Sequence, residues 1–163
     1  MVLRILKFPN PILRKKAKPV KKVTPEVVKL IDNLVETMRA APGVGLAAPQ
    51  VGELVRVIVV EVAGELIALV NPKIVEKSGR QTFTEGCLCL PGVEAPVERA
   101  EYVVVKGLDR YGENVKVEAK GLLATVLQHE IDHLDGVLFI DRVKDPSLIK
   151  HVELKKEKRE ELI

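Results

Sequence analysis

The chain has 163 residues, 47% of them hydrophobic and 30% charged, and a formal net charge of +3. This length suits one domain with one core, so we expect residues 1–163 to form a single domain. No apolar run approaches the roughly 20 residues needed to cross a bilayer, which excludes a membrane-spanning protein. The composition is typical of a globular protein dissolved in water.

The N-terminus and the cysteines indicate a reducing compartment. Residues 1–6 lack the long apolar core and the small-residue cleavage site of a signal peptide. Cys87 and Cys89 are two residues apart, and in an extended strand their Cα atoms would lie near the upper limit of disulfide geometry, about 6.8 Å. We therefore expect free thiols and a cytoplasmic protein.

A basic segment at 14–22 follows a turn that the prolines of segment 8–11 predict. The basic segment contains no aromatic residue on which a base could stack. Charge runs are usually solvated, so we expect an exposed loop and no direct sequence-specific binding of nucleic acid.

The first helix is predicted to begin at Thr24-Pro25-Glu26, which combines a capping hydroxyl, a proline at the first helical position and an acid in the first turn. Apolar residues then recur at helical spacing until about Ala40, so one face of this helix should pack on a core.

The stretch from Pro42 to Gln50 is small, apolar and twice interrupted by glycine. Small residues permit a close approach of the backbone to another group. The stretch is either an ordinary tight connection or a loop that brings backbone groups against a substrate, with Gln50 as a polar group at its end.

The hydrophobic pattern changes to that of strands from Leu54 onward. A hairpin is predicted from strands at 54–62 and 65–70 with Ala63-Gly64 as its turn. Further strands are predicted at 73–76, 83–90, 102–108 and 114–120. Apolar and charged residues alternate in the last of these, which indicates a sheet with one solvated face.

Two more helices complete the expected fold. An apolar helix should run from about Gly121 to Asp135-Gly136, since glycine is common just past a helix end. A last helix is predicted to start at Asp145-Pro146 and to continue into the charged tail at 155–161. The pattern predicts an α+β fold in which antiparallel or mixed sheets surround a central buried helix, with an N-terminal and a C-terminal helix.

The central helix carries the pattern His129-Glu130-Ile131-Asp132-His133. Residues four apart share one helix face, so the two histidines can hold one metal ion while Glu130 acts as a general base. Leu122 and Val126 extend the histidine face toward the N-terminus, which predicts an apolar lining beside the metal.

A catalytic metal site needs a third protein ligand and one open position. Phe139 occupies the place six residues after His133, where a histidine would complete one known pattern, and it cannot ligate. Glu153, on the predicted last helix, and Cys87, as a thiolate from a strand, both remain candidates.

Three motifs taken together resemble the signatures of the peptide deformylase family. They are Gly43-Val44-Gly45-Leu46-Ala47-Ala48-Pro49-Gln50, Glu85-Gly86-Cys87-Leu88-Cys89 and the helical histidine motif. The resemblance covers nearly the whole chain and includes Phe8-Pro9 and Leu13-Arg14. One departure is visible, since the second motif usually ends in Ser where this chain has Cys89.

The resemblance implies removal of the formyl group from the N-terminal formylmethionine of nascent polypeptides, with release of formate. Cys87, His129 and His133 would then bind one divalent metal ion, and Glu130 would transfer protons. Gln50 and the backbone N–H of Leu88 would bind the developing oxyanion. Family members are typically ferrous, so Fe2+ is expected, although a Cys and two His would suit Zn2+; Ni2+ or Co2+ can take its place.

The resemblance also suggests the substrate contacts and the setting. We expect the methionine side chain to contact Val44, Gly45, Phe83, Leu122 and Val126. The partners would be formylmethionyl nascent peptides and, transiently, the ribosome that presents them. The expected location is a bacterial cytoplasm.

A supporting role is predicted for Arg99, which could pair with Glu85 or Asp132 and orient the ligand side chains. Two other functions remain open. One is a zinc peptidase with His129, His133 and Glu153 as ligands. The other is a non-enzymatic binding domain that the metal stabilises.

Overall fold

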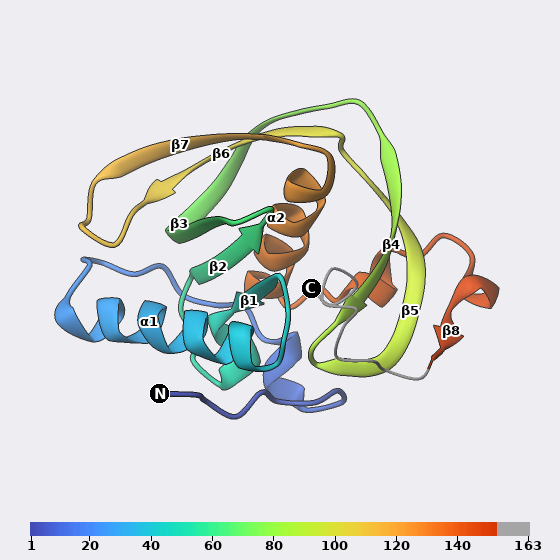
Figure 1. Ribbon diagram of the computed structural model, residues 1–163, viewed down its shortest axis with the longest axis horizontal. Helices are drawn as coiled ribbons and strands as arrows, with labels where there is room; N and C mark the ends of the chain where they lie inside the picture. The colour runs from blue at the N-terminus through green and yellow to red at the C-terminus, as the bar shows by residue number, and fades with distance from the viewer. Residues whose placement is uncertain (153–163) are drawn as a thin grey trace.

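A computed structural model describes residues 1–152, so Glu153 and the predicted helical tail at 155–161 lie outside the described residues. The described part is an α+β structure built from antiparallel sheets and two α-helices (Figure 1). The predicted fold class is therefore confirmed. Among residues 1–152 no helix is long and apolar enough to cross a membrane.

The strands form two sheets, and every pairing within them is antiparallel. The larger sheet has the order β1-β2-β3-β6-β7, with Gly45–Ala47 as β1, Val57–Val62 as β2, Glu65–Ser78 as β3, Tyr102–Leu108 as β6 and Asn114–Lys120 as β7. The smaller sheet has the order β4-β5-β8, with Gln81–Cys87 as β4, Leu90–Arg99 as β5 and Lys150–His151 as β8.

The two α-helices begin and end close to the predicted positions. Helix α1 spans Pro25–Ala40, and the hydroxyl of Thr24 accepts a hydrogen bond from the Val27 N–H at 3.4 Å. Helix α2 spans Gly121–Leu134, and Gly136 beyond it has a φ of +73°, the left-handed conformation that glycine adopts readily. Short 3-10 helices occur at Pro11–Arg14 (η1), Ala48–Val51 (η2), Phe139–Arg142 (η3) and Pro146–Leu148 (η4).

The larger sheet separates two cores. Ile58 and Val60 of β2 belong to the core that contains α2, whereas Val57 and Val59 belong to the core that contains α1. Both faces of β2 are thus covered, which explains its uninterrupted apolar sequence. Figure 1 shows α2 near the centre of the molecule, with the larger sheet on one side and β4 and β5 on the other. This position makes α2 the most enclosed helix of the fold.

Strand β3 joins two strands that the sequence analysis separated. Its pairing with β6 is irregular between Val70 and Lys73, where Asn71 has a φ of +53°. The Asn71 side chain bonds to both backbone groups of Val20 at 2.8 Å, which compensates this irregular position. A bulge therefore continues the strand where Asn71-Pro72 suggested a break.

Strand β5 was not predicted, and the predicted strand at 83–90 is divided. Strand β4 ends at Cys87, a turn contains Leu88 and Cys89, and β5 begins at Leu90. The sequence of β5 does not indicate a strand, because it contains Pro91, Gly92 and Pro96, and proline and glycine are rare inside strands. Hence the two cysteines belong to a strand end and a turn, not to one face of a continuous strand.

The helix predicted from Asp145 is wrong in type and length for the described residues. The Asp145 carboxylate does accept a hydrogen bond from the Ser147 N–H at 3.0 Å, but the resulting 3-10 helix ends at Leu148. The chain then becomes β8 and pairs with Val93 and Glu94 of β5. Pairing with a distant strand overrides the local helix signal.

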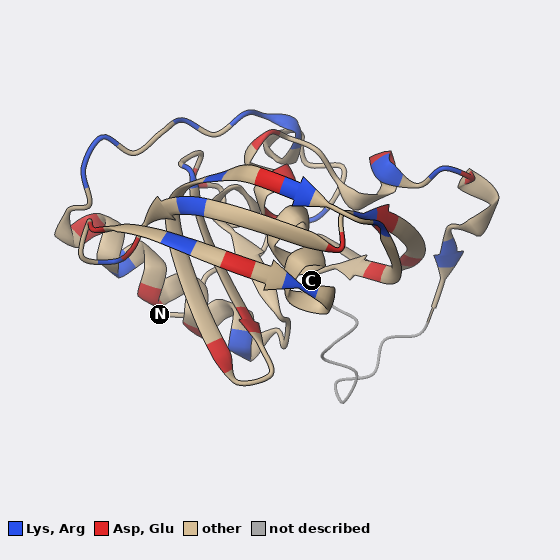
Figure 2. Ribbon diagram, turned by 90° about the horizontal axis from the view of Figure 1, so that it is seen from above, with Lys and Arg blue, Asp and Glu red and all other residues tan. Residues whose placement is uncertain are grey.

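The basic segment 14–22 is largely exposed, as predicted. Its five lysines are all exposed, and the segment runs as a coil between η1 and α1. Figure 2 shows Lys, Arg, Asp and Glu distributed over strands and loops of both sheets. Within this segment, Lys18 forms an isolated parallel β-bridge with Val55.

Candidate metal centre and active site

Three separate parts of the chain bring their polar side chains together around one buried point. Helix α2 contributes His129, Glu130 and His133, the end of β4 contributes Cys87, and η2 contributes Gln50. Each of these five side chains is at most 1% exposed. Such burial of polar groups is costly unless they bind one another or a ligand.

The donor atoms of two histidines and one cysteine lie in contact. Nε2 of His129 lies 3.2 Å from Nε2 of His133, which lies 3.3 Å from Sγ of Cys87. Metal bonds of about 2.0–2.3 Å at tetrahedral angles separate donor atoms by about 3.3–3.8 Å. The two separations lie at or just below the lower end of this range, so His133 can share one metal ion with His129 on one side and with Cys87 on the other.

The unpaired carboxylate of Glu130 is the strongest indication that this site binds a ligand. Both of its carboxylate oxygens are buried and have no hydrogen-bond partner among residues 1–152. Burial, together with the charges of Cys89 and Glu85, raises the pKa of Glu130 well above its usual value. A carboxyl group in this state suits the repeated acceptance and release of a proton.

The ligand side chains differ in how readily they adopt their binding forms. Burial and the charge of His129 lower the pKa of His133, which favours the neutral imidazole that binds metals. Burial and the neighbouring Cys89 raise the pKa of Cys87 and oppose the thiolate. A cation nearby reverses this preference, because a coordinating thiol is deprotonated by the metal.

His129 is oriented by a buried carboxylate. Its Nδ1 atom lies 2.8 Å from a carboxylate oxygen of Glu85, which directs Nε2 toward His133. Arg99 donates two hydrogen bonds to the same carboxylate, at 2.6 and 3.0 Å. Burial raises the pKa of Glu85, but the bonds from His129 and Arg99 outweigh it, so the net shift is downward.

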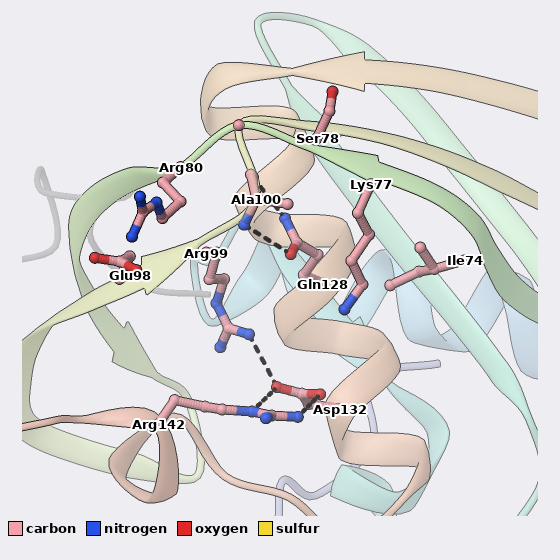
Figure 3. A pocket seen from close by; sticks show the side chains of 11 residues that line it. Ile74, Lys77, Ser78, Arg80, Glu98, Arg99, Ala100, Gln128, Asp132 and Arg142 are labelled. Atoms are coloured by element: carbon pink, nitrogen blue, oxygen red, sulfur yellow. Dashed lines mark hydrogen bonds and ion pairs between the residues drawn. The ribbon is translucent and has the colours of Figure 1, made fainter.

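Arg99 also connects the site to the far side of α2. It donates to Asp132 at 2.9 Å, and Arg142 of η3 donates two bonds to that carboxylate, at 2.9 and 3.1 Å (Figure 3). These side chains border a cavity of about 330 Å³ that Lys77 and Arg80 also line. Arg99 therefore pairs with Glu85 and Asp132 at once, where the sequence suggested one or the other.

The residues expected to contact the methionine side chain come from three separate parts of the chain, namely the start of β1, strand β4 and helix α2. Val44 and Val126 are buried in the core around α2, and Leu122 packs against that core. Phe83 on β4 is half-buried and is not a member of it. Gly45, which is expected to contact the substrate, lies against the side chain of Glu130.

Several groups that support the site are not apparent from the sequence. The backbone N–H of Leu6 donates to the Gln50 carbonyl at 2.7 Å, and that of Phe8 donates to the Cys89 carbonyl at 2.8 Å. Phe139 stacks on His129, with ring centroids 6.0 Å apart. Arg142, which holds Asp132, was also missed. These contacts join residues far apart in the sequence, and no local pattern signals them.

Two imidazoles, one thiol and an unpaired buried carboxylate around one point define the class of the protein as a metal-dependent hydrolase. The sequence profile of one family, described as Polypeptide deformylase, matches residues 2–148. The chain therefore belongs to the polypeptide deformylase family, and the resemblance drawn from the three motifs is confirmed.

Individual relatives agree with this assignment. The chain is 52% identical over 141 residues to a peptide deformylase of Carboxydothermus hydrogenoformans, covering 86% of this chain and 93% of that protein. Identity to the peptide deformylase of Halothermothrix orenii is 55% over 145 residues, covering 87% and 94%. A crystal structure of the Legionella pneumophila enzyme is similar with a TM-score of 0.86 and 46% identity, covering 88% of this chain and 87% of that one.

Proposed function

We propose that this protein removes the formyl group from the N-terminal formylmethionine of nascent polypeptides and releases formate. The observation that carries the proposal is the position of Cys87, whose Sγ lies 3.3 Å from Nε2 of His133. This position supports Cys87 as the third ligand beside the helical histidine pair. Family membership over residues 2–148 supports the same reaction.

Cys87, His129 and His133 would hold the metal ion. When bound, a divalent cation supplies a Lewis acid that lowers the pKa of a water molecule to about 7. Glu130 accepts the proton of the attacking water and later delivers it to the departing amine. The carboxyl group is buried and has no hydrogen-bond partner among residues 1–152, which keeps it available for both transfers.

Gln50 and Leu88 would stabilise the negative charge that develops on the formyl oxygen. The Gln50 Oε1 atom accepts a hydrogen bond from the Ala47 N–H at 2.9 Å, which turns the amide Nε2 toward Cys87, 3.5 Å away. Leu88 is positioned by Lys7, whose Nζ donates to the Leu88 carbonyl at 3.1 Å. Donors fixed before the reaction lower its barrier by about 3–4 kcal/mol each.

We propose Fe2+ as the metal of the active protein, with Zn2+, Ni2+ or Co2+ able to replace it. Metal analysis of protein purified without oxygen tests this assignment. We expect iron to accompany activity. A fully active preparation that contains mainly zinc would contradict it.

The proposed setting is the cytoplasm of a bacterium, with formylmethionyl nascent peptides as the substrate and a transient contact with the ribosome. The exposed lysines of segment 14–22 offer positive charge for that contact. Binding through such charges weakens as salt is added. Co-sedimentation with ribosomes at rising salt concentration is the test, and binding that does not respond to salt would count against it.

A zinc peptidase with Glu153 as third ligand is the rival, and Glu153 lies outside the described residues. Glu153→Gln and Cys87→Ser, made separately, should differ in bound metal. We expect the bound metal to be lost only in Cys87→Ser. Loss of the metal only in Glu153→Gln would contradict the assignment as a deformylase.

The decisive assay compares formate release from a formylmethionyl peptide with cleavage of the same peptide without the formyl group. We expect release of formate and no cleavage of the unformylated peptide. Peptide-bond cleavage of the second without formate from the first would overturn the proposal.

A further inference from the structure

The cavity of about 330 Å³ beside α2 has no role in the proposed reaction. Its walls come from the end of β3, the connection from β3 to β4, the end of β5, helix α2 and η3 (Figure 3). Helix α2 contributes Gln128 and Asp132, which are four residues apart and share one helix face. The histidines of the metal centre do not line the cavity. The cavity is therefore separate from the proposed active site.

Two of the cations that line the cavity have no carboxylate partner in the described part of the chain. Lys77 extends from β3 and Arg80 from the connection after it, and Figure 3 shows them on either side of Arg99. Neither side chain makes an ion pair or a hydrogen bond within residues 1–152. Glu98 also lines the cavity, but it pairs with Lys144 at 3.2 Å. The charges of Lys77 and Arg80 thus remain uncompensated.

Arg99 adds a buried donor group to the same cavity. A guanidinium has five N–H groups, and three of those of Arg99 bond to Glu85 and Asp132. The other two have no partner among residues 1–152, although Arg99 is only 8% exposed. Asp132 cannot supply more negative charge to the cavity, because Arg142 also donates two hydrogen bonds to it. Buried donors without an acceptor are costly, and an oxyanion in the cavity would supply the acceptors.

We propose that this cavity binds a small phosphate-class oxyanion, held by Lys77, Arg80 and the remaining N–H groups of Arg99. Guanidinium groups match the geometry of phosphate oxygens, and a lysine adds a compact positive charge. A phosphate monoester carries about −1.5 to −2 charges at pH 7, which matches the two uncompensated cations better than a monocarboxylate does. The volume lies at the small end of ligand sites, so the ligand is inorganic phosphate or a small phosphate monoester.

Calorimetric titration of the metal-loaded protein at constant ionic strength tests the proposal, with inorganic phosphate, glycerol phosphate and acetate as probes. We expect saturable binding of one phosphate group, at least tenfold weaker in Lys77→Gln and in Arg80→Gln. Lys73→Gln is the matched control, because Lys73 is an exposed lysine of β3 that does not line the cavity. The affinity for Lys73→Gln should equal that of the wild type. The tighter of the two phosphate probes identifies the source of the phosphate group.

Three results would overturn the proposal. They are the absence of saturable binding, binding of acetate as tight as that of phosphate, and binding that persists unchanged in Lys77→Gln and Arg80→Gln. The last result would place the phosphate elsewhere, for example at the metal ion.

Formate release separates this inference from the proposed function. Lys77→Gln and Arg80→Gln should turn over a formylmethionyl peptide at the wild-type rate in phosphate-free buffer, because neither side chain lies at the metal centre. Turnover that falls in both variants would overturn the separate role of the cavity. A wild-type protein that binds phosphate as expected but releases no formate would support this site and contradict the proposed reaction.

Discussion

The carboxylate of Glu130 lies directly against the Cα of Gly45, close enough that a methyl group at residue 45 would overlap it. Gly45 belongs to β1, and such a methyl group would also lie 3.0 Å from Cγ and Cδ of Glu130. The Glu130 side chain therefore fills the space that a side chain at residue 45 would need. The absence of a side chain at Gly45 allows the Glu130 carboxylate, the proposed proton carrier, to occupy its observed position.

Gly45→Ala should displace the Glu130 carboxylate and lower turnover. Misplacing a catalytic group by about 1 Å costs on the order of 10²-fold in rate, so we expect a loss of this size. Steady-state formate release measures it. Bound metal should remain, because the ligand side chains are not touched. Full activity in Gly45→Ala would show that the Glu130 carboxylate can adopt another position that still supports catalysis.

Glu130→Gln tests proton transfer without changing the shape of the side chain. We expect the variant to fold, to bind metal and to lose about 10²–10⁴-fold in kcat, the usual contribution of a general acid or base. Formate release and metal content, measured on one preparation, check this. An unaltered rate would favour a non-enzymatic, metal-stabilised binding domain.

Arg99→Ala removes the cation from the buried carboxylate that orients His129. Leaving Glu85 without it should destabilise the fold by about 3–5 kcal/mol, because an unpaired charge remains buried. Metal affinity should fall about 10–100-fold as His129 loses its fixed orientation. Denaturant unfolding and chelator competition measure the two effects.

Arg142→Ala is the matched control for Arg99. The Arg142 side chain is half-exposed and donates its hydrogen bonds to Asp132, so its loss should cost about 1 kcal/mol or less. Metal affinity should change little. If Arg99→Ala leaves metal affinity and rate unaltered, its proposed positioning role is wrong.

Local signals predicted α1 and α2 well, although they also predicted a helix from Asp145 that the structure does not have. Thr24-Pro25 marks the start of α1, and Gly136 follows the end of α2. Both signals can be read from the sequence, because helix caps depend on residues that are neighbours in the chain. The spacing of His129 and His133 is likewise a local property of a helix. Strands β6 and β7 were also predicted with their observed bounds, since each alternates or is rich in β-branched residues.

The rest of the site depends on contacts between distant segments. Spacing alone does not show whether Cys87 or Glu153 reaches the histidines, and only the resemblance to the deformylase family favours Cys87. The contact of Gly45 with Glu130 and the bonds of Arg142 to Asp132 join separate elements. Strand β5 was missed because its two prolines and its glycine argue against a strand unless its partners are known.

Asp141 gives a prediction for the pH dependence of stability. Its carboxylate accepts hydrogen bonds from the Arg14 guanidinium and, at 2.9 Å, from the Leu138 N–H. Burial raises the pKa of Asp141, but these bonds outweigh burial and hold the pKa below its usual value. A lowered folded-state pKa contributes stability above the unfolded-state pKa of about 3.9, and the contribution is lost as pH falls through the folded-state pKa.

Asp141→Asn should therefore be less stable than the wild type at pH 7 by roughly 0.2–1 kcal/mol, the range for an exposed ion pair. The difference should shrink as the pH falls below about 4 and through the lowered folded-state pKa, because the wild-type carboxylate becomes protonated and loses its charge. Denaturant unfolding of both proteins at pH 7 and at low pH measures this, and all other carboxylates cancel in the comparison. In an Arg14→Gln background the difference at pH 7 should already be smaller. A difference that stays constant with pH would show that the charge of Asp141 does not stabilise the fold.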